Sequence, residues 1–284
     1  MVVAGPQYSL VFSGFCLLAV SSHHWVKSVS ASRPLISVIC CAHNEAEYVD
    51  RSMPLLLRAL EALKESFYEI VFVADRCTDK TVEKARKYGV RLVEKDWKKW
   101  EYSYAESLQT GYLNATGVHV GIIDLDIAVP TSFFRFLVPV LKDRIASVAA
   151  KVVTYPDTFW NRAMYAWERT RDVAPLGQQP YGAARVILKR ALDDVGGFRD
   201  VPTPDTDIDL HFAEKGYRSI SVSAVRVYHL RRLSLKKMVD GQINSGRGRY
   251  ALGLGLVRTM GHSIFRFRPF VICGWLLERQ RRKK

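Results

Sequence analysis

The sequence predicts an α/β fold in which a mixed, mostly parallel central sheet is flanked by helices. In the first half of the chain, short apolar runs rich in β-branched residues alternate with segments whose apolar residues recur at helical spacing. Strands and helices that alternate in this way are typical of right-handed βαβ units and a parallel sheet. The 284 residues suffice for one large domain with appended segments.

Four strands and three helices are predicted in the first half. Pro54 interrupts the pattern of the first helix and predicts a kink or a join between two helices. Thr78 or Asp79 is the expected N-cap of the second helix, and Gly89 is its expected end. The predicted strands are 35–43, 68–75, 90–95 and 118–124, and the predicted helices are 44–66, 78–89 and 101–115.

The second half is less regular, and its elements follow no simple alternation. A helix is expected to begin near residue 234 and to pass through Gly246 and Gly248. The other predicted helices are 131–143, 158–173 and 205–216, and the predicted strands are 147–154, 183–189 and 218–228. This half is expected to complete the sheet and then to leave it.

Polar side chains follow three of the predicted strands, at the point where each strand ends. Asn44 and Glu45 follow the first, Asp75 ends the second, and Asp124 and Asp126 follow the fourth. Ligands bind at the carboxyl ends of parallel strands. In an extended segment the two aspartates point to the same side, which is costly unless a cation or a hydrogen-bond donor lies between them.

The formal net charge of +14 is concentrated at the C-terminal end. Residues 226–284 contain 15 lysines and arginines against 2 acidic residues, so this segment carries +13 of the total. The rest of the chain is close to neutral. A polycationic segment of this kind favours a polyanionic partner, either phospholipid head groups or nucleic acid.

The two ends of the chain are expected to lie outside the folded domain. The apolar run 8–20 is shorter than the ~20 residues that span a bilayer, and it lacks the positive region of a secretory signal. Residues 1–33 are therefore interpreted as a leader, disordered or weakly interfacial. Residues 262–284 mix aromatic, aliphatic and basic side chains, as in a helix that lies among lipid head groups. We assign 34–230 to the domain and 231–284 to a basic helical arm.

The five cysteines have no spacing typical of a zinc site, and one of them must stay unpaired. Cys40 and Cys41 are adjacent within a predicted strand and so point to opposite faces. Cysteines used as small apolar residues indicate a reducing, cytoplasmic environment.

Four segments, in order, resemble those of glycosyltransferase family 2, whose members have the Rossmann-like GT-A fold. The resemblance covers residues 34–250. It implies a nucleotide-binding half at 34–126 and an acceptor half at 127–230. The segments are VICCAHNEAEYV from Val38, VFVADRCTDKTVEKA from Val71, IIDLDIAVP from Ile122, and YGAARVILKRALDDVGGF from Tyr181 followed by PTPDTDIDLHFAEKGY from Pro202.

The resemblance implies a nucleotide-sugar site on the first half. Asp75 is expected to accept a hydrogen bond from the base or ribose, and Glu45 to line the pocket. Asp124 is expected to reach the ribose or a metal ion. Asp79 is better explained as a helix cap, and Glu45 and Asp124 have alternative roles as a solvated glutamate and a turn residue. The residues assigned to the nucleotide sugar are Ala42, Asn44, Glu45, Asp75 and Asp124.

A divalent cation, Mn²⁺ or Mg²⁺, is the expected cofactor. When a sugar leaves a nucleoside diphosphate, negative charge grows on the diphosphate, and a cation held by carboxylate oxygens stabilises it. Asp126 is the expected metal ligand. Related GT-A enzymes place a histidine where His229 stands, and imidazole suits Mn²⁺; a structural role for this histidine is the alternative.

An inverting transfer needs a carboxylate base opposite the leaving group. The family's base is the aspartate of a Glu-Asp pair, and the matching position is Asp205. Pro204 replaces the glutamate, so Asp207 is kept as a second candidate. Asp205 has the alternative role of capping the following helix.

Four arginines are candidates for contacts with the diphosphate or with an acceptor phosphate. They are Arg231, Arg232, Arg247 and Arg249. The alternative for each is a place on a solvated basic face. The Gln-x-x-Arg-Trp motif of processive synthases is not found after Gln242, so transfer of one sugar to a discrete acceptor is expected.

These observations predict a metal-dependent glycosyltransferase that moves a single sugar from a UDP- or GDP-sugar with inversion. In this hypothesis the acceptor is lipid-linked. The basic arm holds the enzyme at an anionic membrane, as a peripheral protein on the cytoplasmic face. One alternative is a retaining GT-A transferase that acts on a small phosphorylated acceptor. Another is a non-enzymatic polyanion binder; nucleic acid binding explains the arm but leaves the strand-end carboxylates unexplained. A nucleotidyltransferase is disfavoured because the segment after the first strand has no glycine.

Overall fold

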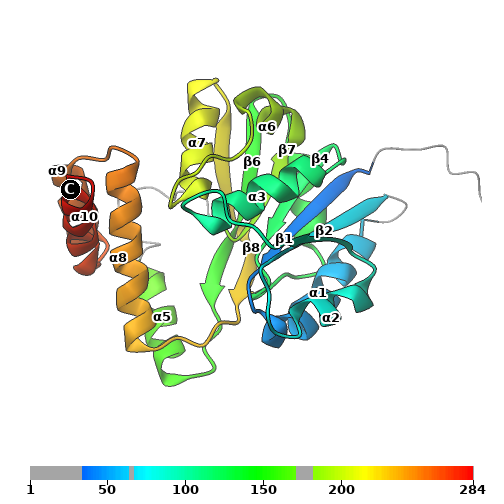
Figure 1. Cartoon of the computed structure of the whole chain (residues 1–284), viewed down its shortest axis with the longest axis horizontal. Coiled ribbons are helices and arrows are strands. Elements are labelled where there is room, and N and C mark those ends of the chain that lie inside the picture. The colour runs from blue at the N-terminus through cyan, green and yellow to red at the C-terminus, as the bar shows by residue number, and fades with distance from the viewer. Residues whose placement is uncertain (1–33, 64–66, 171–181, 284) are drawn as a thin grey trace, which may run out of the picture. The chain divides into compact units, whose positions relative to one another are not determined.

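The computed structural model describes residues 34–63, 67–170 and 182–283 (Figure 1). The predicted leader, residues 1–33, lies outside these ranges, as does the end of the helix predicted at 158–173. Within the described ranges, no helix is both long and apolar enough to cross a lipid bilayer.

The sheet has eight described strands in the order β3-β2-β1-β4-β7-β6-β8-β5. The pairs β3-β2, β2-β1 and β1-β4 are parallel, β7 is antiparallel to both β4 and β6, and β8 is parallel to β6. The predicted mixed, mostly parallel sheet is confirmed. The strands are β1 Ile36–Ala42, β2 Tyr68–Asp75, β3 Arg91–Lys95, β4 His119–Ile123, β5 Ile127–Ala128, β6 Ile145–Thr154, β7 Ala184–Leu188 and β8 Arg218–His229.

Helices cover the sheet, and strands β1, β2 and β4 are buried along almost their whole length. A strand with helices on both faces is apolar throughout, which is why these strands appear in the sequence as continuous apolar runs. The helices are α1 Ala46–Glu61, α2 Thr81–Ala85, α3 Ser103–Asn114, α4 Phe133–Leu137, α5 Phe159–Thr170, α6 Lys189–Val195, α7 Pro204–Glu214, α8 Leu235–Ala251, α9 Leu256–Phe265 and α10 Phe270–Arg281.

Prolines account for the main differences from the predicted helices. Helix α1 continues through Pro54, so the predicted join between two helices is wrong; buried Met53 and Leu56 hold the two turns against the core. The helix predicted at 131–143 is shorter, because Pro139 lies in a single 3₁₀ turn after α4. Pro204 begins α7 at a position where a missing N–H costs nothing.

The basic arm is a set of three helices in which α10 contacts both α8 and α9 (Figure 1). Helices α8 and α10 approach until their backbones touch: a Cβ on Gly246 would overlap the carbonyl oxygen of Val271, and one on Gly274 would overlap that of Ile243. The arm also contacts the domain, because a Cβ on Gly248 would overlap the side chain of Thr203, which directly precedes α7.

We expect Gly246→Ala and Gly274→Ala each to lower the free energy of unfolding by about 1–3 kcal/mol, because the added methyl group forces the two helices apart. Gly241→Ala and Gly261→Ala are the matched controls, since a Cβ at either position meets nothing within 4 Å. These two should raise stability by up to about 1 kcal/mol through helix propensity. Urea unfolding of the four variants measures the difference, and equal effects at all four positions would contradict the close contact.

Candidate active site

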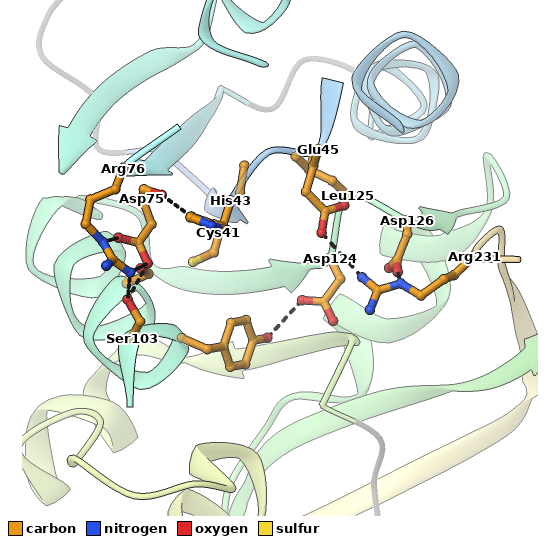
Figure 2. A pocket seen from close by; sticks show the side chains of 13 residues that line it. Cys41, His43, Glu45, Asp75, Arg76, Ser103, Asp124, Leu125, Asp126 and Arg231 are labelled. Atoms are coloured by element: carbon orange, nitrogen blue, oxygen red, sulfur yellow. Dashed lines mark hydrogen bonds and ion pairs between the residues drawn. The ribbon is translucent and has the colours of Figure 1, made fainter. Parts of the chain in front are cut away.

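A pocket of about 460 Å³ opens at the carboxyl ends of β1, β2 and β4 (Figure 2). This is the edge of the sheet at which the sequence predicts a ligand site. Six of the predicted residues line the pocket, namely Ala42, Glu45, Asp75, Asp124, Asp126 and Arg231. The other lining residues are Cys41, His43, Arg76, Ser103, Tyr104, Ser107 and Leu125.

Asn44 and Asp79 hold the turns beside the pocket. Asn44 has a left-handed backbone with φ of 55°, and its Oδ1 accepts hydrogen bonds from the N–H groups of Thr78, at 2.7 Å, and Asp79, at 3.2 Å. Asp79 accepts from the N–H of Ala46 in the first turn of α1 and from that of Thr81 in the first turn of α2. Asn44 is not among the described lining residues. Its nucleotide contact stays a prediction.

Asp75 ends β2, and its carboxylate is surrounded by donors. Arg76 Nε and Lys95 Nζ each donate to Oδ1 at 2.8 Å, while Ser103 Oγ and Arg76 Nη2 donate to Oδ2. Burial alone would raise the pKa of Asp75, but these hydrogen bonds lower it to about 2. Four donors fill the lone pairs of a carboxylate, so a base or ribose could bind Asp75 only by displacing one of them. The side chain of Arg76 is 37% exposed, whereas that of Lys95 is fully buried.

Lys95 lies under this edge of the pocket and is fully buried. Its ammonium group donates to Asp75, to Glu106 Oε2 at 2.9 Å and to the carbonyl oxygen of Trp97 at 3.0 Å. All three ammonium donors therefore have acceptors, which is what a buried lysine requires. Because Lys95 comes from β3 and Glu106 from α3, this ion pair joins three elements below the pocket.

Asp124 and Asp126 lie in a turn and not in an extended strand. The N–H of Ile127 donates to the carbonyl oxygen of Asp124 at 3.0 Å, so the expectation of alternating extended residues is wrong. Both carboxylates nevertheless line the pocket. Burial and the charge of Asp126 raise the pKa of Asp124 to about 7, and the hydroxyl of Tyr104 donates to Asp124 at 2.8 Å.

Asp126 is buried, and pairing of β5 with β8 brings His229 and Arg231 beside it. His229 Nε2 lies 3.4 Å from Asp126 Oδ2, and Arg231 Nε lies 2.7 Å from it. Neither contact has hydrogen-bond geometry, so this buried oxygen accepts no hydrogen bond from a described residue. Such an oxygen is costly to bury without a further positive partner.

Glu45 faces the same arginine from the start of α1. Arg231 Nη2 lies 3.3 Å from Glu45 Oε1, and the other carboxylate oxygen of Glu45 is buried without a described hydrogen-bond partner. Burial and the charge of Asp126 raise the pKa of Glu45, although Arg231 opposes this effect. The guanidinium of Arg231 therefore joins two carboxylates across the pocket, as Figure 2 shows.

Asp126 and His229 are the described residues best placed to hold a metal ion together. No group of three or more metal-ligating side chains is found in the described part of the chain. Two ligands are the number expected where the rest of the coordination comes from substrate phosphates and water.

The predicted acceptor-side residues are spread over α7. Asp205 lies against Gly182, and its charge raises the pKa of both Asp124 and Tyr104. Asp207 is buried and accepts two hydrogen bonds from Arg199; it is not among the described lining residues. Both roles as a base stay predictions, although Asp205 is within electrostatic reach of the pocket and Asp207 is engaged elsewhere.

Of the four predicted arginines, the structure brings only Arg231 to the pocket within the described ranges. Arg232 and Arg247 are exposed. Arg249 donates to Thr259 Oγ1 and to the carbonyl oxygen of Arg258, so it lies inside the arm. Contacts of these three with an acceptor phosphate stay predictions.

Sequence reasoning missed several residues at the pocket. Lys95 ends β3, so the rule that selected Asp75 could have selected it as well. Tyr104 and Ser103 begin α3 and match no motif, and Arg76 directly follows β2 but was not singled out. Their roles depend on contacts between separate elements, which a linear pattern does not contain.

The family model of glycosyl transferase family 2 matches residues 37–194, more than half of the chain, so the chain belongs to this family. The protein is therefore a glycosyltransferase that uses a nucleotide sugar, and the predicted enzyme class is confirmed. A comparison with curated protein sequences gave no match.

Solved structures share the fold at low sequence identity. The mannosyltransferase PcManGT from Pyrobaculum calidifontis, in complex with GDP-Man and Mn²⁺, has a TM-score of 0.59 and 20% identity over 87% of this chain and 70% of its own. Glucosyl-3-phosphoglycerate synthase from Mycobacterium tuberculosis, in complex with phosphoglyceric acid, has a TM-score of 0.56 and 17% sequence identity. The match covers 77% of this chain and 78% of the synthase. These similarities confirm the GT-A fold.

We expect Lys95→Met to lower the free energy of unfolding by about 3–5 kcal/mol at pH 7, because it leaves Asp75 and Glu106 buried without their shared cation. The difference from the native protein should shrink between pH 7 and pH 5. In the native protein the lowered pKa of Asp75 keeps its contribution constant in that range, and it is lost only below about pH 4. In the variant Asp75 keeps its donors Arg76 and Ser103, but Glu106 loses the ammonium group that lowers its pKa, so burial raises the pKa of Glu106 and protonation relieves part of the penalty.

Urea unfolding at both pH values measures this effect. Lys99→Met is the control, because this lysine is exposed and should change stability by no more than about 0.5 kcal/mol. A penalty that stays the same at pH 5 would contradict the role assigned to the buried charges.

Proposed function

We propose that the protein transfers a single sugar from a UDP- or GDP-sugar, with a divalent cation, to one hydroxyl of a discrete acceptor. The observation that carries the proposal is the pocket in which Asp126, Glu45 and Asp124 face Arg231 at the strand ends. Its volume of about 460 Å³ is in the range of small-molecule sites. The GDP-Man and UDP named with the similar structures support a nucleoside diphosphate donor.

The residues present fit a divalent ion. Asp126 Oδ2 is buried, lacks a hydrogen bond from the described residues, and lies 3.4 Å from His229 Nε2. That separation suits two ligands of one ion at bonds of about 2.1 Å. Bound there, Mn²⁺ or Mg²⁺ would stabilise the charge that develops on the departing diphosphate. The similar structures named with Mn²⁺ and Mg²⁺ support this choice.

Arg231 supplies positive charge to the same place. Its guanidinium lies between Asp126 and Glu45 and can bind diphosphate oxygens through two parallel N–H groups. On the other side of the pocket, Ser103 and Arg76 line the pocket and hydrogen-bond Asp75, and they form the expected surroundings of the base and ribose. Ala42, Asn44 and Asp124 complete the proposed donor site.

For the acceptor we propose Asp205 as the base of an inverting transfer, with Asp207 as the second candidate. Asp205 is supported by its place in the first turn of α7, near enough to the pocket for its charge to raise the pKa of Asp124 and that of Tyr104. A retaining transfer to a small phosphorylated acceptor is the alternative, favoured by the shared fold with glucosyl-3-phosphoglycerate synthase. The anomeric configuration of the product, read by proton NMR, distinguishes the two.

We propose a lipid-linked acceptor at an anionic membrane, with the enzyme peripheral to the cytoplasmic face. The concentration of +13 of the formal charge in residues 226–284 supports this location. Arg232, Arg247 and Arg249 belong to this segment and are the proposed acceptor-phosphate contacts. Family membership disfavours the alternative of a non-enzymatic polyanion binder.

We expect calorimetric titration to show that either UDP or GDP binds, and that binding depends on Mn²⁺. In Asp126→Ala the metal-dependent part should weaken by about 100-fold or more, because a metal ligand is lost. Asp240→Ala is the control, since this aspartate is exposed on α8. If the folded native protein binds neither nucleotide in the presence of Mn²⁺, the proposed donor site is wrong.

We expect Arg231→Met to bind Mn²⁺ about tenfold more tightly than the native protein when nucleotide is absent. The guanidinium lies 2.7 Å from the proposed metal ligand, and like charges at such distances repel. Nucleotide binding should weaken in the same variant, because a diphosphate contact is lost. Electron paramagnetic resonance of free Mn²⁺ measures the first effect, with Arg232→Met as control; an unchanged Mn²⁺ affinity would show that Arg231 and the ion occupy separate places.

A further inference from the structure

Helix α9 is folded with its apolar side outward. Val257 and Ile264 are 84% and 64% exposed, while Thr259 and Ser263 are buried. Residues three, four and seven apart share one face of a helix, so Val257, Met260 and Ile264 form a continuous apolar stripe. An ordinary surface helix of a globular protein turns this stripe toward the core.

Hydrogen bonds fix this orientation. Thr259 Oγ1 donates to the carbonyl oxygen of Gly255 and accepts from Arg249 Nε, and Ser263 Oγ donates to the carbonyl oxygen of Arg268. The hydrogen bonds to Gly255 and Arg268 are local to α9 and the turn after it, whereas the one from Arg249 joins α9 to α8 and would be lost if α9 turned over. The outward stripe is therefore part of the fold of the arm.

The end of α9 and the turn after it carry exposed aromatic rings. Phe265 and Phe267 are 55% and 71% exposed, and Phe270 begins α10 nearby. Phe267 has φ of 50°, a left-handed conformation that is uncommon for a bulky residue. Single exposed apolar residues are normal, but a stripe that continues into exposed rings marks an interaction surface.

The surroundings of this surface are positive. From residue 231 to the end, the sequence has 14 lysines and arginines and only two acidic residues, Asp240 and Glu278. Glu278 is buried and paired with Arg281 and Arg282, so it adds no exposed negative charge. Arg258 is exposed on α9 itself, next to the stripe.

We propose that α9 and the 265–270 turn dock on a membrane that contains anionic lipids. The helix lies parallel to the surface, with Val257, Met260 and Ile264 at the boundary between head groups and acyl chains. An outward apolar face bordered by basic residues fits such an interface, because acyl chains cover the apolar side chains and phosphates meet the cations.

This surface reaches the proposed acceptor side through α8. Gly248 of α8 packs on Thr203, and α7, with Asp205 in its first turn, begins at the next residue. A lipid-linked acceptor would therefore meet the pocket from the side on which the arm holds α7. This consequence, like the membrane location itself, rests on the proposed function, whereas the outward apolar face of α9 is observed in the structure.

The test is sedimentation of the full chain with vesicles of phosphatidylcholine containing about 30% phosphatidylglycerol. We expect the native protein to sediment with these vesicles and about tenfold less with phosphatidylcholine alone, and the binding to fall at high salt. The double variant Val257→Asp, Ile264→Asp should lose about tenfold or more in affinity. Leu113→Asp is the matched control, because Leu113 is 71% exposed on α3 and should bind like the native protein.

Native protein that stays in the supernatant at low salt would overturn the proposal, as would a double variant that binds like the native protein. A native dimer that the double variant dissociates would show that a second copy covers the surface instead. Nucleotide titration of the same variant separates this inference from the proposed function. Unchanged UDP or GDP binding with lost vesicle binding supports the docking surface, whereas vesicle binding without any nucleotide binding leaves it standing and removes the donor site.

Discussion

The rest of this structure depends on one constraint: the negative charges of carboxylates at one edge of the sheet must be balanced by positive charges. Parallel strands end at a common edge, so the acidic residues that follow them converge. Distant segments supply the cations that balance these charges. Lys95 of β3 forms an ion pair with Asp75, and Arg231, which follows β8, forms ion pairs with Asp126 and Glu45. These ion pairs fix the outer strand and the last strand relative to the central ones.

Asp124 is the exception to this compensation. Its described hydrogen-bond donor is the neutral hydroxyl of Tyr104, and burial with the charge of Asp126 raises its pKa to about 7. Near neutral pH its ionisation therefore depends on its surroundings, and a cation that enters the pocket favours the carboxylate form. The side chains of the pocket therefore carry more negative charge when a cation is bound than when it is absent. This is the behaviour expected of a cation-binding site.

The sequence predicted the features that depend on local pattern. Strands such as 68–75 and the carboxylates at their ends followed from apolar runs and from the geometry of parallel sheets. The turn at Asp124, the burial of Lys95 and the choice of Arg231 over Arg232 depend on contacts between elements far apart in the chain. The orientation of α9 belongs to the same class, because periodicity gives an apolar stripe but not the side to which it faces.

The basic arm contacts the segments that hold α3 and α7 in place. Asp200 accepts hydrogen bonds from the N–H groups of Glu101 and Tyr102, which precede α3 and its Tyr104. Arg281 of α10 pairs with Glu101, and Gly248 of α8 packs on Thr203 before α7. The arm therefore contacts the segments that lead into α3, which lines the pocket, and into α7, which carries Asp205. Protein interiors are close-packed and transmit small displacements. A movement of the arm would therefore displace Tyr104 and the start of α7 together.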